Sequence, residues 1–157
     1  MQFQDVDNED AWGLNLTETL FPKILRDNGY ATYALGKWHL GHYSPRYLPT
    51  ARGFDDYLGY LTGESFFWSK RVPGNQHFHD LLYMDQDCYH GYNGTDKGKY
   101  STFLYRDKAI DIIHYHDYTE RALFLYLAFQ AVHDPYYDQK HFTDGIPKDY
   151  LDVTFIL

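Results

Sequence analysis

One lysine and two histidines stand out because each closely follows a predicted strand. Lys37 and His39 lie in the segment GKWHLG at 36–41, and His133 lies in QAVHDP at 130–135. A lysine beside small glycines supplies a point charge, and imidazoles supply directional N–H donors, so the three side chains suit a tetrahedral oxyanion. The same groups can move protons. The bland alternative is a solvated turn lysine with two structural histidines.

The first predicted helix–strand unit places Lys37 and His39. A helix is predicted over 17–28, with Thr17 or Thr19 as the N-cap, and Pro22 favours the later cap because proline fits only near the first turn. Asn28 and Gly29 supply the stop signal. The segment 30–35, YATYAL, is rich in strand formers and predicts a short buried strand.

A second unit places His133. A helix is predicted from Ser101 or Thr102 to about 114–116, because Phe103, Ile110 and Ile113 share one helical face. The run LFLYLAF at 123–129 is typical of a strand covered on both faces.

Two helix–strand units favour an α/β fold with parallel strands. In such sheets ligands bind beyond the carboxyl ends of the strands, which is where all three candidate residues fall. Between 52 and 99, glycines and aromatic residues without clean periodicity predict loops and short strands. The length of 157 residues fits one domain, 1–157.

Composition excludes several function classes. A formal net charge of −8 argues against a nucleic-acid surface, which needs clustered lysine and arginine. No apolar run is long enough for a membrane helix, and the opening residues do not read as a secretory leader. The single cysteine, Cys88, stands among acidic residues, which do not favour a reactive thiolate, so it is expected to have no functional role.

Three segments resemble the sulfatase family of the arylsulfatase type. GYATYALGKWHLG at 29–41 is similar to the second sulfatase signature, LPTARGFDDYLGY at 48–60 is similar to a further family segment, and 123–135 is similar to the later strand and histidine loop. Their order resembles the B, I and J branch of the arylsulfatases. The likeness runs from about 12 to 148.

The resemblance implies an alkaline-phosphatase-like α/β core with a mainly parallel sheet flanked by helices. It also implies a sulfuric ester hydrolase, of which this chain is an internal, incomplete part of the N-terminal catalytic domain. Lys37 would bridge the sulfate and a formylglycine nucleophile, His39 would hydrogen-bond a formylglycine hydroxyl, and His133 would contact the sulfate or its leaving oxygen. Lys37 and His133 would thus bind substrate.

Other family features are missing from the sequence. The C/S-x-P-S-R motif that yields formylglycine is absent, since Tyr89 follows Cys88. The early Asp pair and the later Asp-Asn pair that hold the family's Ca²⁺ together with formylglycine have no counterpart either. The chain alone is therefore expected to be inactive. The resemblance implies an aryl or carbohydrate sulfate ester as the substrate of the whole enzyme, and the missing remainder of the domain as a possible partner of this chain. The alternative is a non-catalytic sulfatase-like binding module or relic.

Several competing interpretations concern polar and aromatic clusters. The pairs His77/His79 and His114/His116 suggest zinc, but neither pair has helical metal spacing and no second cysteine is present. Asp55 and Asp56 are expected to be structural. The aromatic residues could form a wall for a sugar or aryl group, although core packing is the expected use. These residues are Phe66, Phe67, Trp68 and Tyr89.

Two glycosylation tripeptides begin at Asn15 and Asn93. Together with the resemblance, they lead to the expectation of a glycoprotein of the secretory pathway, lysosomal or extracellular.

Overall fold

The computed structural model describes residues 11–86, 89–91 and 98–133. Its helices and strands are α1 (Phe21–Asp27), β1 (Ala31–Lys37), the 3-10 helices η1 (Pro45–Tyr47) and η2 (Thr50–Arg52), β2 (Asp56–Tyr60), β3 (Arg71–Val72), β4 (Asn75–His79), β5 (Leu82–Met84), β6 (Tyr89–Gly91), α2 (Ser101–Tyr115) and β7 (Leu123–Ala128). Two helix–strand units, α1–β1 and α2–β7, lie on either side of a stretch of 3-10 helices and short strands, in the order that the sequence predicts.

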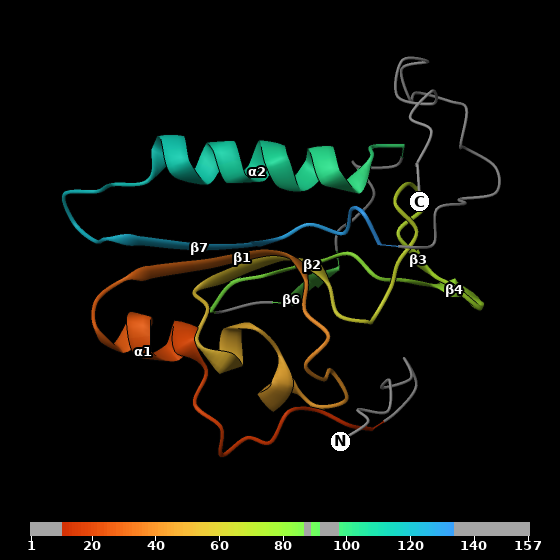
Figure 1. Cartoon of the computed structure of the whole chain (residues 1–157), viewed down its shortest axis with the longest axis horizontal. Helices are drawn as coiled ribbons and strands as arrows, with labels where there is room; N and C mark the ends of the chain where they lie inside the picture. Colours follow the sequence, from red (N-terminus) through yellow and green to blue (C-terminus); the bar gives the residue numbers. More distant parts are fainter. Residues whose placement is uncertain (1–10, 87–88, 92–97, 134–157) are drawn as a thin grey trace, which may run out of the picture.

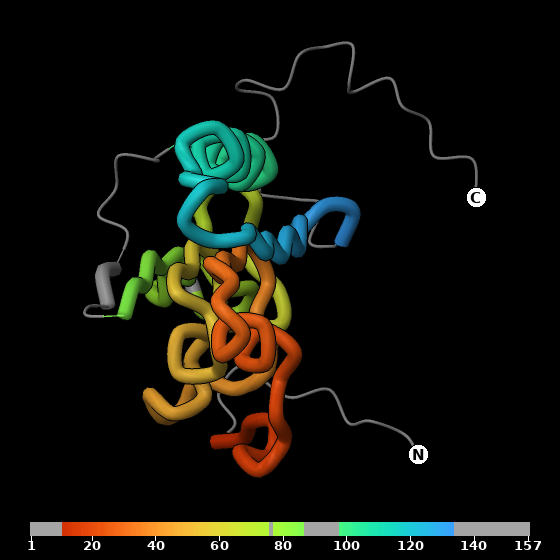
Figure 2. The backbone as a smooth tube through the Cα atoms, turned by 90° about the vertical axis from the view of Figure 1, so that its left-hand side faces the viewer, coloured from red at the N-terminus to blue at the C-terminus, as the bar shows by residue number. Residues whose placement is uncertain are grey.

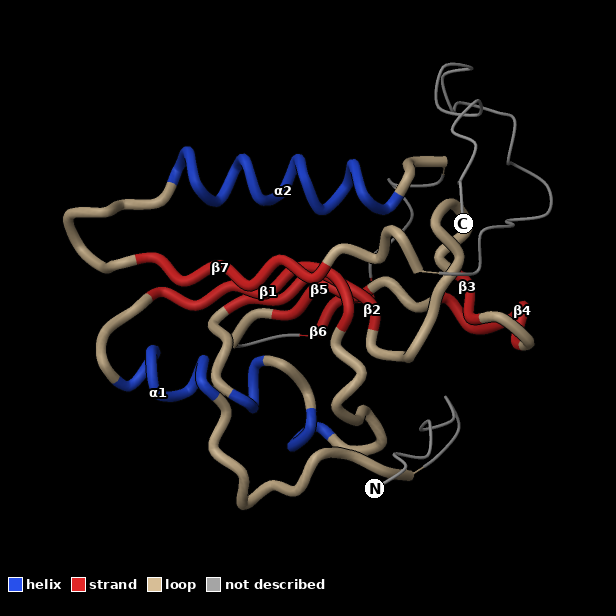
Figure 3. Tube along the Cα trace, in the orientation of Figure 1, coloured by secondary structure: helices blue, strands red, loops and turns tan. Residues whose placement is uncertain are grey.

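A five-stranded sheet in the order β6-β5-β2-β1-β7 forms the middle layer (Figures 1 and 3). Strand β1 runs parallel to β2 on one side and to β7 on the other. Strands β5 and β6 extend the sheet in the antiparallel sense, and β3 pairs with β4 separately. Turned by 90°, the backbone shows β7 to one side of β1 and β5 to the other (Figure 2). The expectation of a mainly parallel sheet flanked by helices is confirmed.

Each face of the sheet carries a core. Helix α2 covers one face, where Leu104, Tyr105 and Ala109 pack against Leu35 and Leu58 of the sheet (Figure 1). Helix α1 and the two 3-10 helices lie on the opposite face. The buried core there comprises Ala34, Trp38, Leu48, Phe54, Tyr57, Leu61 and Met84.

Helix α1 is shorter than predicted. It begins at Phe21 with Leu20 as the N-cap, no side chain caps it, and the proposed threonine cap at 17 or 19 is wrong. Proline explains the late start, because Pro22 occupies the first turn, where its missing N–H costs nothing. The predicted stop is confirmed, since Asn28 is the C-cap and Gly29 has φ +86°.

The burial of α2 and β7 differs from what their apolar residues suggest. The face of α2 that carries Phe103, Ile110 and Ile113 is exposed, and the helix instead buries its other face. Strand β7 is an edge strand that ends at Ala128, and Tyr126 remains 48% exposed, so the strand is only partly covered. Apolar side chains of this run, such as Tyr126 and Phe129, are therefore left exposed by the part of the chain that the structure describes.

Within the described ranges, no helix combines the length and the apolar character needed to cross a membrane.

Candidate functional site

Lys37 and His39 lie at the carboxyl end of β1. Lys37 is the last residue of the strand rather than the first residue after it, and it pairs in register with Tyr60 of β2. The chain then continues along β2, because the N–H of Trp38 donates to the Tyr60 carbonyl at 3.0 Å and the N–H of His39 donates to the Leu61 carbonyl at 3.2 Å. Both Lys37 and His39 are half-buried.

Glycines let the backbones converge just before the candidate residues. A Cβ on Gly36, whose φ is +101°, would lie 1.8 Å from the carbonyl oxygen of Ala128, and a Cβ on Gly59 would lie 1.9 Å from the carbonyl oxygen of Gly36. The hydroxyl of Tyr57 lies 2.9 Å from the Gly36 oxygen and 2.8 Å from the Tyr60 oxygen. Burial raises the pKa of Tyr57 well above its usual range, so the hydroxyl stays a donor. No side chain other than hydrogen fits at Gly36 or Gly59.

Trp38 anchors the segment that carries His39. Its buried indole Nε1 lies 3.1 Å from the carbonyl of Gly41 and 2.9 Å from the carbonyl of Tyr47. The ring meets Phe54 edge to face, with centroids 6.2 Å apart. The segment after β1 is therefore fixed at a residue adjacent to His39.

A loop at 61–65 supports the His39 ring. A Cβ on Gly63 would lie 2.9 Å from Cε1 and 3.0 Å from Nε2 of His39, so the imidazole rests directly against this glycine. The loop is held by Asp80, which is 1% exposed and accepts the N–H groups of Leu61 and Thr62 at 2.9 Å each. The Thr62 hydroxyl lies 2.6 Å from the same carboxylate. One buried carboxylate thus sets the position of the surface under His39.

His133 approaches the same edge of the sheet from β7. Gly36 of β1 pairs with Ala128 of β7. Lys37 comes one residue after Gly36, and His133 comes five residues after Ala128. The N–H of His133 donates to the Gln130 carbonyl at 2.9 Å, which closes a turn, and the side chain is exposed. The structure therefore brings Lys37, His39 and His133 to the carboxyl ends of two neighbouring parallel strands.

A second loop, 66–70, links this edge to α2. The ammonium of Lys70 is buried and donates to the carbonyls of Phe67 at 2.8 Å and Trp68 at 2.9 Å, and to that of Lys99 at 2.5 Å. Phe67 stacks on Tyr100 with centroids 5.2 Å apart. Phe67 and Trp68 are buried, which supports core packing rather than a ligand wall for these two residues. The side chain of Tyr89 lies outside the described residues.

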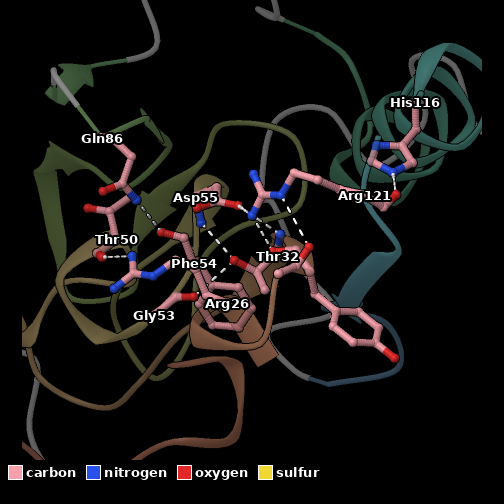
Figure 4. A network of polar contacts seen from close by, with 11 residues as sticks. Arg26, Thr32, Thr50, Gly53, Phe54, Asp55, Gln86, His116 and Arg121 are labelled. Carbon is pink, nitrogen blue, oxygen red and sulfur yellow. Dashed lines mark hydrogen bonds and ion pairs between the residues drawn. The ribbon is translucent and has the colours of Figure 1, made fainter. Parts of the chain in front are cut away.

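A polar network ties together the opposite edge of the sheet (Figure 4). Asp55 Oδ2 accepts the N–H of Thr32 at 3.0 Å and the Arg121 guanidinium at 3.0 Å. Arg121 also donates to the carbonyls of Gly29 and Tyr30. This network joins the amino ends of β1, β2 and β7, so Asp55 has the structural role that the sequence predicts.

The described residues do not fit a metal. Asp56 accepts the hydroxyl of Tyr83 at 3.1 Å, and burial raises the pKa of its carboxyl group. Among residues 11–86, 89–91 and 98–133, no three His, Cys, Asp or Glu side chains are grouped for coordination. Neither the zinc interpretation of the histidine pairs nor a calcium site is therefore supported by this part of the chain.

Sequence reasoning assigned no role to Asp80 or Gln130. For Gln130 the available signal was a polar residue directly after the apolar run at 123–129, whereas Asp80 follows the polar strand β4 and has no such signal. The partners of both side chains come from distant segments. Cys88 and Asn93 lie outside the described residues.

The sulfatase family model matches residues 1–151 of the chain. Arylsulfatase J of Mus musculus is 38% identical over 125 residues, covering 78% of this chain and 20% of the relative. N-acetylgalactosamine-6-sulfatase of Sus scrofa is 32% identical over 136 residues, covering 85% and 26% respectively. The chain thus spans about a fifth to a quarter of these relatives.

Solved structures agree with this assignment. The crystal structure of Ps i-CgsB in complex with k-i-k-neocarrahexaose matches with a TM-score of 0.64 at 26% identity, over 80% of this chain and 29% of that one. The PsFucS1 sulfatase from Pseudoalteromonas sp. shares the fold, with a TM-score of 0.62 at 18% identity over 83% and 30%. The expected alkaline-phosphatase-like α/β core agrees with these neighbours. The chain belongs to the sulfatase family.

Proposed function

We propose that the chain supplies the sulfate-binding side of a sulfuric ester hydrolase active site. The observation that carries the proposal is the position of Lys37, His39 and His133 at the carboxyl ends of β1 and β7, which are paired in register. A cation and two imidazoles at one edge of a parallel sheet suit a tetrahedral oxyanion.

Each side chain has a distinct role in the proposal. Lys37 stabilises the negative charge of the sulfate as a point charge. His39, resting against Gly63, hydrogen-bonds the nucleophile that the sulfatase resemblance implies, and His133 contacts the sulfate or the oxygen of the leaving alcohol. Because the described residues offer no fitting ligand set for calcium, no step is assigned to a metal.

The proposed substrate is a carbohydrate or aryl sulfate ester. A relative named N-acetylgalactosamine-6-sulfatase and a similar structure holding k-i-k-neocarrahexaose support the carbohydrate class. The exposed side of the site supports it as well, because His133 is accessible to a bulky ester.

Titration with inorganic sulfate, followed by NMR shifts of the histidine rings, tests the binding proposal. Wild-type chain is expected to respond at His39 and His133, and Lys37→Ala is expected to weaken binding about tenfold or more through loss of a charged partner. Lys23→Ala is the control, because Lys23 is exposed on α1 and its ammonium pairs with Asp27 of the same helix. Equal responses to sulfate and to chloride at matched ionic strength would overturn the proposal.

We also propose that the 157-residue chain alone has no sulfatase turnover, because the sequence holds no formylglycine motif. Hydrolysis of an aryl sulfate by the pure chain, above a Lys37→Ala control, would refute this. Sulfate binding without hydrolysis by the longest natural form of the protein would instead favour the non-catalytic binding module.

The proposed compartment is the secretory pathway. Asn15 is exposed within an Asn-Leu-Thr tripeptide, so it is accessible to a glycosyltransferase. Expression in a secretory host should give a glycosidase-sensitive increase in mass that Asn15→Gln reduces. An unmodified Asn15 in material that has passed through the secretory pathway would count against the proposal.

A further inference from the structure

We infer that Gln130 is a positioning residue that locks the His133 turn to the loop supporting His39. The inference rests on the proposed function, since it concerns how two of the proposed sulfate-binding residues are held relative to each other. It follows from the two hydrogen bonds of one buried side-chain amide.

The first bond ties Gln130 to α2. Gln130 is 2% exposed, and its Oε1 accepts the hydroxyl of Ser101, the first residue of α2, at 2.7 Å. Ser101 is itself fully buried, and its backbone N–H donates to the Phe67 carbonyl at 2.9 Å. The helix therefore presents a fixed donor to the amide.

The second bond ties Gln130 to the 61–65 loop. Its Nε2 donates to the carbonyl of Ser65. Ser65 ends the same loop that Asp80 holds at Leu61 and Thr62, and Gly63 within that loop lies against the His39 ring. The 61–65 loop is thus fixed at both ends, by Asp80 at one and by Gln130 at the other.

The main chain of Gln130 extends this connection to His133. Its carbonyl accepts the N–H of His133 at 2.9 Å. A chain of contacts therefore runs from the His39 ring through Gly63, Ser65 and Gln130 to the His133 turn. The hydrogen bonds in this chain of contacts join neutral groups, and the Gln130 amide is shielded from water because its side chain is buried.

Only an amide satisfies both partners. Oε1 must accept from a hydroxyl while Nε2 donates to a carbonyl, so a carboxylate loses the donor and an apolar side chain loses both bonds. Gln130→Met keeps the length of the side chain and removes the hydrogen bonds, which separates their effect from loss of volume. Ser101→Ala is the milder variant, since it leaves the bond to Ser65 in place.

Two measurements on the 157-residue chain test the inference. The first is amide hydrogen exchange at His133, which Gln130→Met is expected to accelerate about tenfold or more and Ser101→Ala less. The second is affinity for inorganic sulfate under conditions where each variant is folded, which Gln130→Met is expected to lower about tenfold. A merely structural role would lower the unfolding midpoint and leave the affinity of the folded chain unchanged.

Gln86→Met is the matched control. Gln86 also donates from its side-chain amide to a carbonyl, that of Phe54 at 2.8 Å, but it belongs to the network at the opposite edge of the sheet (Figure 4). Exchange at His133 and sulfate affinity should both stay within about twofold of wild type.

The outcomes separate the two proposals. Absence of any sulfate response in the wild type refutes the proposed function. Hydrogen exchange at His133 still tests in that case whether Gln130 holds the His133 turn. Unchanged exchange at His133 in both Gln130→Met and Ser101→Ala overturns the positioning role, and so does faster exchange with sulfate affinity equal to wild type. If Gln130→Met does not fold, the Ser101→Ala result decides by the same criteria.

Discussion

Replacing Asp80 by asparagine should destabilise the chain by about 3 kcal/mol. The carboxylate is buried and accepts two backbone N–H groups at 2.9 Å and the Thr62 hydroxyl at 2.6 Å. The substitution keeps the shape but turns one acceptor into an NH₂ donor. At the Leu61 side this leaves a buried N–H facing another donor, which costs about 1–3 kcal/mol, and the remaining bonds lose their charge assistance.

Urea unfolding followed by tryptophan fluorescence measures this change, because Trp38 and Trp68 are buried. A loss of that size corresponds to a fall in Tm of about 6–12 °C for a chain of this length. The same variant should weaken sulfate binding, since the loop under His39 loses its anchor. Asp111→Asn, on the exposed side of α2, is the control and should change stability by less than about 0.5 kcal/mol. A similarly small effect of Asp80→Asn would refute the reasoning.

Three further predictions concern the site, alkaline pH and the opposite edge. Gly63→Ala should displace the His39 imidazole, because the new Cβ would lie 2.9 Å from Cε1, and should lower sulfate affinity about tenfold as judged by NMR titration. Burial raises the pKa of Tyr83 to about 12, so the stability that its neutral hydroxyl contributes is complete below pH 10 and is lost as pH rises towards 12. The urea midpoint should therefore fall less between pH 9 and pH 11.5 in Tyr83→Phe than in the wild type. Arg121→Ala should cost about 1 kcal/mol, less in 1 M salt, because its pair with Asp55 at 3.0 Å is partly exposed.

The predictions for Gly63 and Arg121 each have a matched control. Gly74→Ala meets open space, so it should strain its own turn, where φ is +80°, without changing sulfate affinity. Arg106→Ala removes an exposed pair with its neighbour Asp107 and a contact of the guanidinium with the Phe103 ring on the same helix, so it should cost less stability than Arg121→Ala. The first argument is contradicted if Gly63→Ala binds sulfate as tightly as the wild type. The second is contradicted if the urea midpoint of Tyr83→Phe falls as much at alkaline pH as that of the wild type, and the third if the two arginine variants are equally stable.

Local signals account for the part of the fold that the sequence predicts. The stop at Asn28-Gly29 reflects the backbone itself, since Gly29 adopts φ +86°, and the apolar run at 123–129 identifies β7. Both helix–strand units and their parallel strands follow from such signals. The N-cap prediction was wrong by one residue even for the later candidate, Thr19, because the helix begins at Phe21 with Leu20 as its N-cap and without a side-chain cap.

Contacts between distant segments explain what the sequence could not predict. The antiparallel extension by β5 and β6 depends on pairing with β2, which no local pattern encodes. The sequence does not identify the buried face of α2, because Phe103, Ile110 and Ile113 form an apolar stripe that stays exposed, whereas Leu104, Tyr105 and Ala109 contact the sheet. The candidate residues were found by position after strands and by resemblance, while their support from Asp80 and Gln130 required the packed structure.

The pairing of β1 with β7 has a consequence for the order of folding. Strand β1 meets β2 soon after it in the chain, but β7 comes much later, and Arg121 at its start reaches back 92 residues to Gly29. During synthesis, the edge of β1 that pairs with β7 would therefore stay unpaired until residues 123–128 have been made. Lys37 and His39 would be in place early, and His133 would join them only at the last strand pairing. Because β7 is an edge strand whose partner is β1, local opening of β7 would separate His133 from Lys37 and His39 while β1 and β2 stay paired.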